Sequence, residues 1–233
     1  MEHNIVCGID EAGRGPLWGP VTAAAVIFPP GVAIDGLKDS KKLSPAKREG
    51  LEQQILGSCY WGLGWASSQE IDQINILQAS LVSMVRAWED LINRFQSHLL
   101  ETFGHIHTGT DNSIQKLFEN IRILTDGSIA PEIKSMNVEA IIKGDGLIPE
   151  ISAASILAKT ARDRWVTQWV DSHDPQDTYG LRNHKGYPTG YHRKMIEVHG
   201  LHQLHRRTFN TGTKPGVFLT FFQLFESKQQ KTL

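Results

Sequence analysis

The chain has 233 residues, a length that fits one domain or one domain with a small extension. Its formal net charge of -1 at pH 7 gives no overall attraction for a polyanion, so any nucleic-acid surface must be local and offset by acids elsewhere. The chain does not open with a signal-peptide pattern, and no apolar run reaches membrane-spanning length. The two cysteines, Cys7 and Cys59, have the apolar neighbours of reduced core residues in a cytosolic protein. The sequence therefore predicts a soluble cytoplasmic protein without a membrane partner.

Strand-like and helix-like patterns alternate along the N-terminal half. Strands are expected at Ile5–Ile9, Val21–Phe28 and Tyr60–Ala66. Between the last two, Ser44 as N-cap and Pro45 at the first helical position predict a helix that runs to about Leu56. A long helix opens at Ser68–Asp72, and its helical spacing predicts a buried face made of Ile71, Ile74, Leu77, Leu81, Met84, Val85, Trp88 and Leu91.

The C-terminal half continues the alternation. Two short apolar runs, Ile121–Leu124 and Val138–Ile142, are expected to be strands. A helix is expected to start at Pro149-Glu150, and the loop-rich C-terminal third turns helical from about Tyr191. This order of elements predicts an α/β domain with a central sheet.

Two segments depart from this pattern. Arg94–Lys116 has no sustained period and is expected to be a surface insertion. Its His105 and His107 would share a face if extended, but no cysteine or acid stands at a supporting spacing, which disfavours a metal site. The aromatic stretch Val217–Phe225 is expected to pack back on its own domain, with docking of a partner as the alternative.

The stretch from Ile5 to Val21, IVCGIDEAGRGPLWGPV, carries the strongest chemical signal. An apolar run delivers two adjacent acids, Asp10 and Glu11, into a turn of glycine, arginine and proline. Neighbouring side chains on a strand point to opposite faces, so both acids can serve one site only if the strand ends there and the backbone bends. Glycines at 13 and 15 permit that bend and a close approach of another backbone.

Two other expected strands also end in an acid beside a glycine. Asp126 follows in LTDGS and Asp145 in IIKGDG, and loops at strand ends converge on ligands in α/β sheets. Four carboxylates gathered there would repel one another without cations, which indicates hard divalent metals such as Mg²⁺. Two ions about 4 Å apart would activate a water and stabilise the leaving oxygen in phosphodiester hydrolysis.

An ordered set of motifs, from near the N-terminus to about Phe209, resembles bacterial ribonuclease HII. The matching segments are IDEAGRGPLWGPV, DSKKLS, INIL, LTDGS, KGDGLIPEISAASILAKTARD and HKGYPT. The resemblance implies a ribonuclease H-like fold, with a central mixed sheet flanked by helices and a C-terminal helical segment. It also implies a catalytic domain over residues 1–210, followed by an aromatic extension at 211–233.

The resemblance further implies a metal-dependent endonuclease that uses Mg²⁺ or Mn²⁺, with two ions when substrate is bound. Such enzymes cut the RNA strand of RNA/DNA hybrids and cut 5′ of single ribonucleotides in duplex DNA. The family's metal-binding acids correspond to Asp10, Glu11, Asp126 and Asp145. Its motif that reads the ribose 2′-hydroxyl corresponds to Gly13, Arg14 and Gly15, and its partner tyrosine to Tyr187.

These implied roles agree with the chemistry of the residues. Only RNA offers a 2′-hydroxyl, so groups near that oxygen distinguish it from DNA, while Arg14 can pair with a phosphate. The loop residues Ser40, Lys41 and Lys42 combine a hydroxyl with two cations, a set suited to backbone phosphates.

Several other residues have structural or indirect interpretations. Asp163 is expected to form a structural ion pair or a helix cap instead of a fifth metal ligand, and Lys159 on the same helix is a candidate for a role at the site. Trp18 replaces a smaller family residue and is expected to reshape the substrate groove. The histidines of the C-terminal third suggest zinc, but without a nearby cysteine they are expected on a surface near the nucleic acid: His192, His199, His202 and His205.

Three functional hypotheses stay open at this point. The first is a two-metal ribonuclease of the HII type, acting as a monomer, with a replication-factor contact through the C-terminal tail. The second is the sister ribonuclease HIII, disfavoured because the chain begins at the acidic motif, without the extra N-terminal domain, and because the motif reads GRG. The third is a non-catalytic nucleic-acid-binding module, disfavoured because all four acids are present.

Overall fold

The computed structural model describes residues 5–37, 43–103 and 121–212, with the backbone alone at 99–103. The chain divides into two compact units. Unit 1 comprises Met1–Arg14 and Pro20–Trp165, and unit 2 comprises Gly15–Gly19 and Val166–Leu233. The domain boundary expected at residue 210 stays a prediction, because most of the aromatic extension lies outside the described residues.

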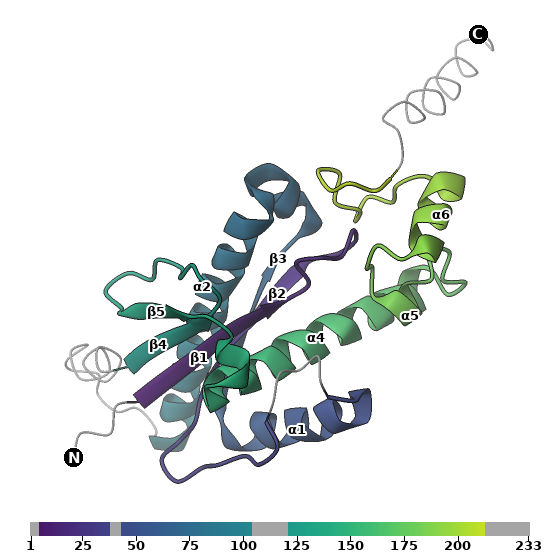
Figure 1. Ribbon diagram of the computed structural model, residues 1–233. Coiled ribbons are helices and arrows are strands. Elements are labelled where there is room, and N and C mark those ends of the chain that lie inside the picture. The colour runs from purple at the N-terminus through teal and green to yellow at the C-terminus, as the bar shows by residue number, and fades with distance from the viewer. Residues whose placement is uncertain (1–4, 38–42, 104–120, 213–233) are drawn as a thin grey trace, which may run out of the picture. The chain divides into compact units, whose positions relative to one another are not determined.

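Unit 1 is built on a mixed sheet, shown in Figure 1. Its strands are β1 (Ile5–Ala12), β2 (Val21–Ile27), β3 (Tyr60–Ala66), β4 (Ile121–Asp126) and β5 (Val138–Ile141). They lie in the order β3-β2-β1-β4-β5, so the first strand of the chain is central. β2 is antiparallel to β1 and β3, whereas β1, β4 and β5 are mutually parallel neighbours. This sheet confirms the α/β class and the central mixed sheet expected from the sequence.

Helices cover both faces of the sheet in unit 1. They are α1 (Pro45–Ser58), α2 (Ser68–Phe103) and the part of α4 (Pro149–His173) up to Trp165. Figure 1 shows α2 on one face of the sheet and α1 with α4 on the other. The helix start predicted at Ser44 is confirmed, because its side chain accepts a hydrogen bond from the Lys47 amide at 3.3 Å.

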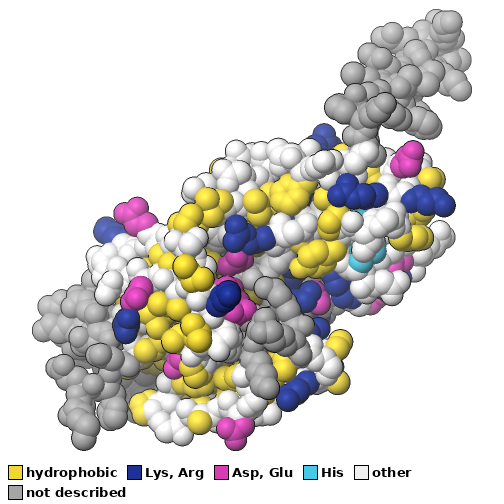
Figure 2. Space-filling model, viewed as in Figure 1, with side chains coloured by type: hydrophobic (Ala, Val, Ile, Leu, Met, Phe, Trp, Pro, Cys, Tyr) yellow, Lys and Arg dark blue, Asp and Glu magenta, His cyan; other side chains and the backbone are white. Residues whose placement is uncertain are grey.

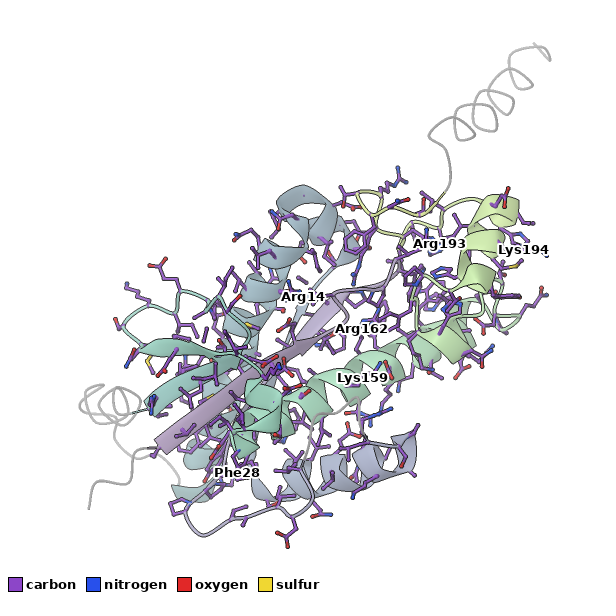
Figure 3. The ribbon with its side chains drawn as sticks, viewed as in Figure 1. Arg14, Phe28, Lys159, Arg162, Arg193 and Lys194 are labelled. Atoms are coloured by element: carbon purple, nitrogen blue, oxygen red, sulfur yellow. The ribbon has the colours of Figure 1, made fainter. Side chains whose placement is uncertain are left out.

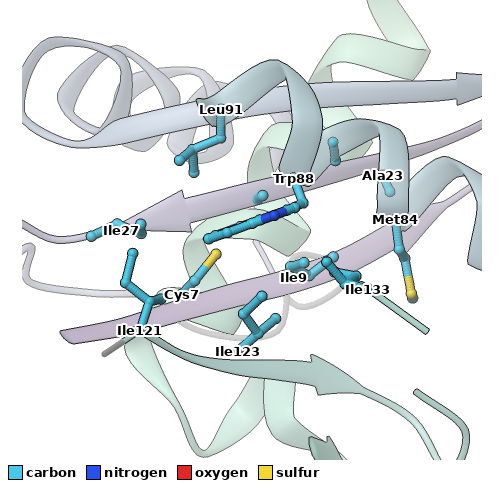
Figure 4. Close-up of a cluster of buried hydrophobic side chains, with 12 residues drawn as sticks. Cys7, Ile9, Ala23, Ile27, Met84, Trp88, Leu91, Ile121, Ile123 and Ile133 are labelled. Atoms are coloured by element: carbon cyan, nitrogen blue, oxygen red, sulfur yellow. The ribbon is translucent and has the colours of Figure 1, made fainter. Parts of the chain in front are cut away.

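The alternation of side chains along the sheet creates two cores. Ala23, Ala25 and Ile27 of β2 face α2, and they join the cluster drawn in Figure 4 with Cys7, Ile9, Met84, Trp88, Leu91, Ile121, Ile123 and Ile133. The intervening Ala24 and Val26 join the second cluster with α1 and α4. Small side chains on this fully buried strand let helices approach closely from both sides.

Helix α4 begins directly against the central strand. A Cβ atom placed on Gly8 of β1 would lie 2.1 Å from the backbone carbon of Glu150, so a side chain has no room there. The glycine therefore brings the first turns of α4 close to the end of β1, where the two adjacent acids stand.

The long helix α2 differs from its predicted form in two ways. Asn75 has non-helical angles (φ 66°, ψ 166°), and its side chain accepts hydrogen bonds from the amides of Leu77 and Gln78 at 3.0 and 3.1 Å. This internal cap shifts the helical phase, and Ile74, expected to be buried, is 38% exposed. Residues 94–103 of the predicted insertion belong to α2, so that part of the prediction is wrong. His105 and His107 lie outside the described residues.

Unit 2 contains the rest of α4, the short helix α5 (Leu181–His184) and α6 (Gly190–His199). Trp18 is fully buried in this unit, with its ring edge-on to Trp169 at a centroid distance of 4.8 Å. Its backbone also forms an isolated β-bridge with His205. The side chain of Trp18 therefore belongs to the interior of the unit, and its expected effect on the substrate groove stays a prediction.

None of the helices in the described part of the chain combines the length and the apolar character needed to cross a bilayer.

Candidate metal and substrate site

Three of the four predicted acids meet at one end of the sheet in unit 1. Asp10 comes from β1, Asp126 ends β4, and Asp145 lies in the 3-10 turn η2 (Gly144–Gly146). One carboxylate oxygen from each lies within 4.8 Å of the others. Since β1, β4 and β5 run parallel side by side, their ends meet at the same edge, as the spacing predicts.

The short connection after β5 fixes the third acid. Lys143 adopts a left-handed conformation with φ 60°, and the following turn brings the Asp145 amide to 3.5 Å from a carboxylate oxygen of Asp126. The Ser152 hydroxyl donates to the Asp145 carbonyl at 2.5 Å. The turn is therefore held both by its neighbour strand and by the first turn of α4.

The electrostatics of the site favour a cation. Burial raises the pKa of Asp10 well above its usual range, and the nearby charges of Glu11 and Asp126 raise it further. Burial also raises the pKa of Glu11, against the lowering effect of the Arg14 guanidinium. A divalent cation would remove this repulsion, and an all-carboxylate oxygen set suits Mg²⁺ or Mn²⁺.

Glu11 stands apart from the group of three acids. Its carboxylate accepts a hydrogen bond from the Arg14 guanidinium at 3.2 Å. Strand β1 does not end at the acid pair, because pairing with β2 continues through Ala12 opposite Thr22. The bend comes at Gly13, whose φ is +95°, one of the two glycines expected to permit it. The strand runs three residues past its expected end at Ile9.

Gly13 is required by a buried arginine that the sequence reasoning missed. A Cβ atom on Gly13 would lie 2.2 Å from Nε of Arg162, and that Nε donates to the Pro20 carbonyl at 2.9 Å. Arg162 is fully buried on α4 and packs beneath the Gly13 turn of unit 1. Figure 3 shows Arg162 and Lys159 coming from α4 and Arg14 from the turn after β1. The sequence Ala161-Arg162-Asp163 could have indicated this arginine, but only Asp163 was considered as a functional residue.

Ser155 is a second residue that the sequence reasoning missed. Its side chain hydrogen-bonds to Asp10, which lowers the pKa of that carboxyl against the larger effect of burial. It follows Ser152 by one helical turn, and such a spacing places both hydroxyls on one face of α4. Two serines in a run of alanines could have indicated this contact.

The two charged residues expected on α4 pair with each other. The Lys159 ammonium lies 2.8 Å from a carboxylate oxygen of Asp163, one turn away. Asp163 therefore forms the ion pair expected from the sequence. Both side chains of this ion pair are partly exposed, so the pair contributes little to the stability of the fold.

Unit 2 contains the other part of the predicted substrate motif. A Cβ atom on Gly15 would lie 3.4 Å from Cε1 of Tyr187, an ordinary van der Waals distance, so the tyrosine ring lies beside this part of the turn. The Tyr187 side chain is 39% exposed, and its ring is accessible to a ligand. The predicted phosphate-binding residues Ser40, Lys41 and Lys42 lie outside the described residues.

The histidines expected on a surface are partly in the interior of unit 2. His192 is 0% exposed and His205 is 1% exposed, with 3.1 Å between their Nε2 atoms. The segment after α6 is not helical, so His202 and His205 do not share a helix face. The expected surface position is wrong for these two residues, because α6 turns His192 inward beside Ile196.

The buried histidines predict acid sensitivity. Desolvation lowers the pKa of His192 to about 4 and that of His205 to about 3. The folded protein then binds fewer protons than the unfolded chain below pH 6.5, so the free energy of unfolding falls as the pH falls. Each histidine is expected to contribute a loss of about 2 kcal/mol at pH 5, relative to neutral pH.

Urea unfolding between pH 7.5 and pH 5 measures this effect. The buried carboxyls have the opposite sign, because their raised pKa values add stability on acidification. The comparison that isolates the histidines is therefore wild type against His205→Gln, which is expected to show a shallower loss. Equal slopes in the two proteins would contradict the prediction.

Comparison with known proteins gives the family. A sequence model described as Ribonuclease HII matches residues 7–212. A relative described as Ribonuclease HII from Nitrosospira multiformis is 45% identical over 210 residues, which cover 89% of this chain and 90% of the relative. One from Treponema denticola is 43% identical over 210 residues, which cover 88% of this chain and 98% of the relative.

Solved structures share the fold. The ribonuclease H2 of Pyrococcus horikoshii OT3 aligns with a TM-score of 0.60 at 22% identity, covering 97% of this chain and 99% of that one. The RNase HII in a complex with PCNA from Archaeoglobus fulgidus aligns with a TM-score of 0.56 at 23% identity, covering 88% of this chain and 95% of that one. Bst-RNase HIII in complex with Mn²⁺ aligns with a TM-score of 0.54 at 17% identity, covering 89% of this chain and 67% of that one. The fold and the family match agree: this chain belongs to the ribonuclease HII family and is a type 2 ribonuclease H.

Proposed function

We propose that this chain cuts 5′ of single ribonucleotides embedded in duplex DNA. This activity would be in addition to the endonuclease activity on RNA/DNA hybrids that membership of the ribonuclease HII family supports. The observation that carries the proposal is the meeting of Asp10, Asp126 and Asp145 within 4.8 Å at the sheet edge. Asp10 is buried and the other two acids are partly buried, and a cation among them would relieve the repulsion between their charges.

We assign Asp10, Glu11, Asp126 and Asp145 as the residues that hold two divalent ions, Mg²⁺ or Mn²⁺. The Mn²⁺ complex of Bst-RNase HIII is consistent with this choice of metal. When bound, the ions would supply the positive charge that activates a water and stabilises the leaving 3′-oxygen. Glu11 pairs with Arg14 in this structure. On joining the ions it would leave the guanidinium to a phosphate of the substrate.

Ribose selectivity is assigned to the turn of Gly13, Arg14 and Gly15 together with Tyr187. The close contact between Gly15 and the tyrosine ring supports this assignment. Backbone groups of the turn would read the 2′-hydroxyl, and the exposed ring would stack on the adjoining sugar. A substrate without that hydroxyl would leave the polar groups of the turn unpaired, which is the physical basis of rejection.

Phosphate contacts are assigned to the loop of Ser40, Lys41 and Lys42. On the face shown in Figure 2, the described Lys and Arg side chains are interspersed with Asp and Glu side chains. With a net charge of -1, affinity must come from local contacts of this kind.

A contact with a replication factor through residues 211–233 is a further part of the proposal. The Archaeoglobus fulgidus relative was solved in complex with PCNA, and the extension of this chain is rich in aromatic residues.

The cytoplasmic location and the monomeric state stay predictions from the sequence.

The test is cleavage of a DNA duplex that carries one ribonucleotide, with Mg²⁺ and then with EDTA. Cleavage is expected only with the metal, 5′ of the ribonucleotide, with a 3′-hydroxyl and a 5′-phosphate as the new ends. Mass spectrometry of the fragments identifies these ends. A 2′,3′-cyclic phosphate would mean that the 2′-hydroxyl attacked, and the two-metal assignment would have to be abandoned.

The same assay separates the alternatives. A non-catalytic module would bind the duplex without cutting it in either buffer. An enzyme of the HIII type would cleave the hybrid while sparing the single ribonucleotide, so an all-RNA/DNA hybrid is the companion substrate.

A further inference from the structure

The backbone of Tyr187 is hydrogen-bonded to two histidines in unit 2, to the ring of His192 and to the backbone of His184. The Tyr187 carbonyl lies 3.0 Å from Nδ1 of His192, and the Thr189 amide donates to the same carbonyl at 2.8 Å. The Tyr187 amide donates to the His184 carbonyl at 2.9 Å. The backbone amide and the backbone carbonyl of Tyr187 are therefore both hydrogen-bonded to partners within the unit.

Backbone partners determine which ring nitrogen of each histidine carries a proton. A carbonyl can only accept, so Nδ1 of His192 must donate to the Tyr187 carbonyl. An amide can only donate, so Nδ1 of His205 must accept from the His202 amide at 2.8 Å. In a neutral ring the proton of His205 then resides on Nε2, and the proton of His192 on Nδ1.

These two assignments agree at the contact between the rings. With 3.1 Å between the Nε2 atoms of His192 and His205, one must donate and the other accept. His205 has its proton on Nε2 and His192 does not, so His205 donates to His192. The result is one directed chain from the His202 amide through both rings to the Tyr187 carbonyl, with every ring nitrogen paired.

His184 is fixed in the same way on the other side of the tyrosine. Its Nδ1 accepts from the Gly186 amide at 3.2 Å, so its Nε2 donates to the Tyr179 carbonyl at 2.9 Å. Its ring stacks on that of His192 at a centroid distance of 4.6 Å. Burial lowers the pKa of each of the three histidines, in agreement with neutral rings at physiological pH.

We infer that His192 and His205 are positioning residues, which fix Tyr187 for the sugar next to the ribonucleotide through one chain of neutral imidazole hydrogen bonds. The inference rests on the proposed role of Tyr187. Protonation of His192 would place two donors face to face at the Nε2 contact, and protonation of His205 would set its Nδ1 donor against the His202 amide. Neutrality of both rings is therefore part of the arrangement. Because Tyr187 is 39% exposed, the direction of its side chain depends on its backbone, which His192 contacts directly and His205 supports through His192.

Two substitutions at one position separate this role from a general structural one. In His192→Asn, the amide nitrogen occupies the place of Nδ1 and can still donate to the Tyr187 carbonyl. In His192→Gln, the amide reaches the place of Nε2 and can still accept from His205, but the donor to Tyr187 is lost. Both variants lose one buried partner, so their melting temperatures should fall by similar amounts.

Their effects on catalysis should differ. On the single-ribonucleotide duplex, His192→Gln is expected to lower kcat/KM about tenfold, the scale of one lost hydrogen bond. His192→Asn is expected to stay close to wild type, and the all-RNA/DNA hybrid should be affected less by either variant. Ile196→Val on the same buried face of α6 is the control for mild destabilisation and should leave both activities unchanged. Equal losses in the Asn and Gln variants would overturn the inference.

Two further measurements keep the inference distinct from the proposed function. Nitrogen-15 NMR of the imidazoles at pH 7.5 should show His192 protonated at Nδ1 and His205 at Nε2, and any other pattern overturns the inference without an activity assay. In a Tyr187→Ala background, His192→Gln should cause no further change in the preference between the two substrates. A further change there would overturn the inference alone, whereas a Tyr187→Ala protein with unchanged preference would overturn the proposed role of the tyrosine.

Discussion

Replacement of Asp126 by asparagine is expected to abolish measurable cleavage while the protein stays folded. Asp126 contributes one of the three carboxylate oxygens that lie within 4.8 Å of one another, and an amide cannot supply its charge to a divalent cation. The loss in kcat should be about a thousandfold or more, because preorganised charge at the reacting centre acts on this scale. Affinity for the substrate should change little, since phosphate contacts elsewhere supply most of it.

The stability of the same variant gives an independent measurement. In EDTA, the free energy of unfolding of Asp126→Asn should exceed that of wild type, because one of the mutually repelling charges is gone. Glu132→Gln, an exposed acid in the loop after β4, is the matched control and should retain full activity. Unchanged cleavage by folded Asp126→Asn would contradict the four-carboxylate assignment.

Replacement of Tyr187 by alanine is expected to remove most activity on a single embedded ribonucleotide. The expected loss is about a hundredfold, between the effect of one hydrogen bond and the rejection achieved by a full hydroxyl-reading site. Tyr187→Phe should lose less, because the ring beside Gly15 remains and only the hydroxyl group is missing. All-RNA/DNA hybrids should suffer more mildly, because they offer many registers for cleavage.

Kinetics of both variants on both substrates measure this difference. Tyr191→Ala is the control, since Tyr191 is another exposed tyrosine of unit 2 and lies close in the sequence. If Tyr187→Ala cleaved the single-ribonucleotide duplex at the wild-type rate, Tyr187 would be only a turn residue, and other residues would have to provide the ribose selectivity.

The parts of the structure that the sequence predicted are those governed by local rules. The strand at Tyr60–Ala66 and the helix cap at Ser44 follow from alternation and from N-cap chemistry, and both are confirmed. The meeting of Asp10, Asp126 and Asp145 follows from acids placed at the ends of strands that prove to be parallel neighbours. Fold class and the acidic group were therefore accessible without coordinates.

The parts that the sequence could not give depend on partners distant in the chain. His192 and His205 look like surface histidines in a polar segment, and only the packing of unit 2 shows that backbone groups satisfy their nitrogens. The exposure of Ile74 depends on an internal cap at Asn75, which a helical period cannot reveal. Glu11 was assigned with the other acids, but its carboxylate pairs with Arg14 on a strand that continues three residues past its expected end at Ile9.

The position of β1 at the centre of the sheet has a consequence for the order in which the protein is synthesised. β1 leaves the ribosome first, but its parallel neighbour β4 begins only at Ile121. A nascent chain can pair β1 with β2 and β2 with β3, and can pack α2 on them, while Asp10 is still without the other two acids. Since parallel pairing across such a long connection is slow, the acidic group is among the last features to form. The growing chain would thus be sheet-like well before it could hold a metal ion or cut a nucleic acid.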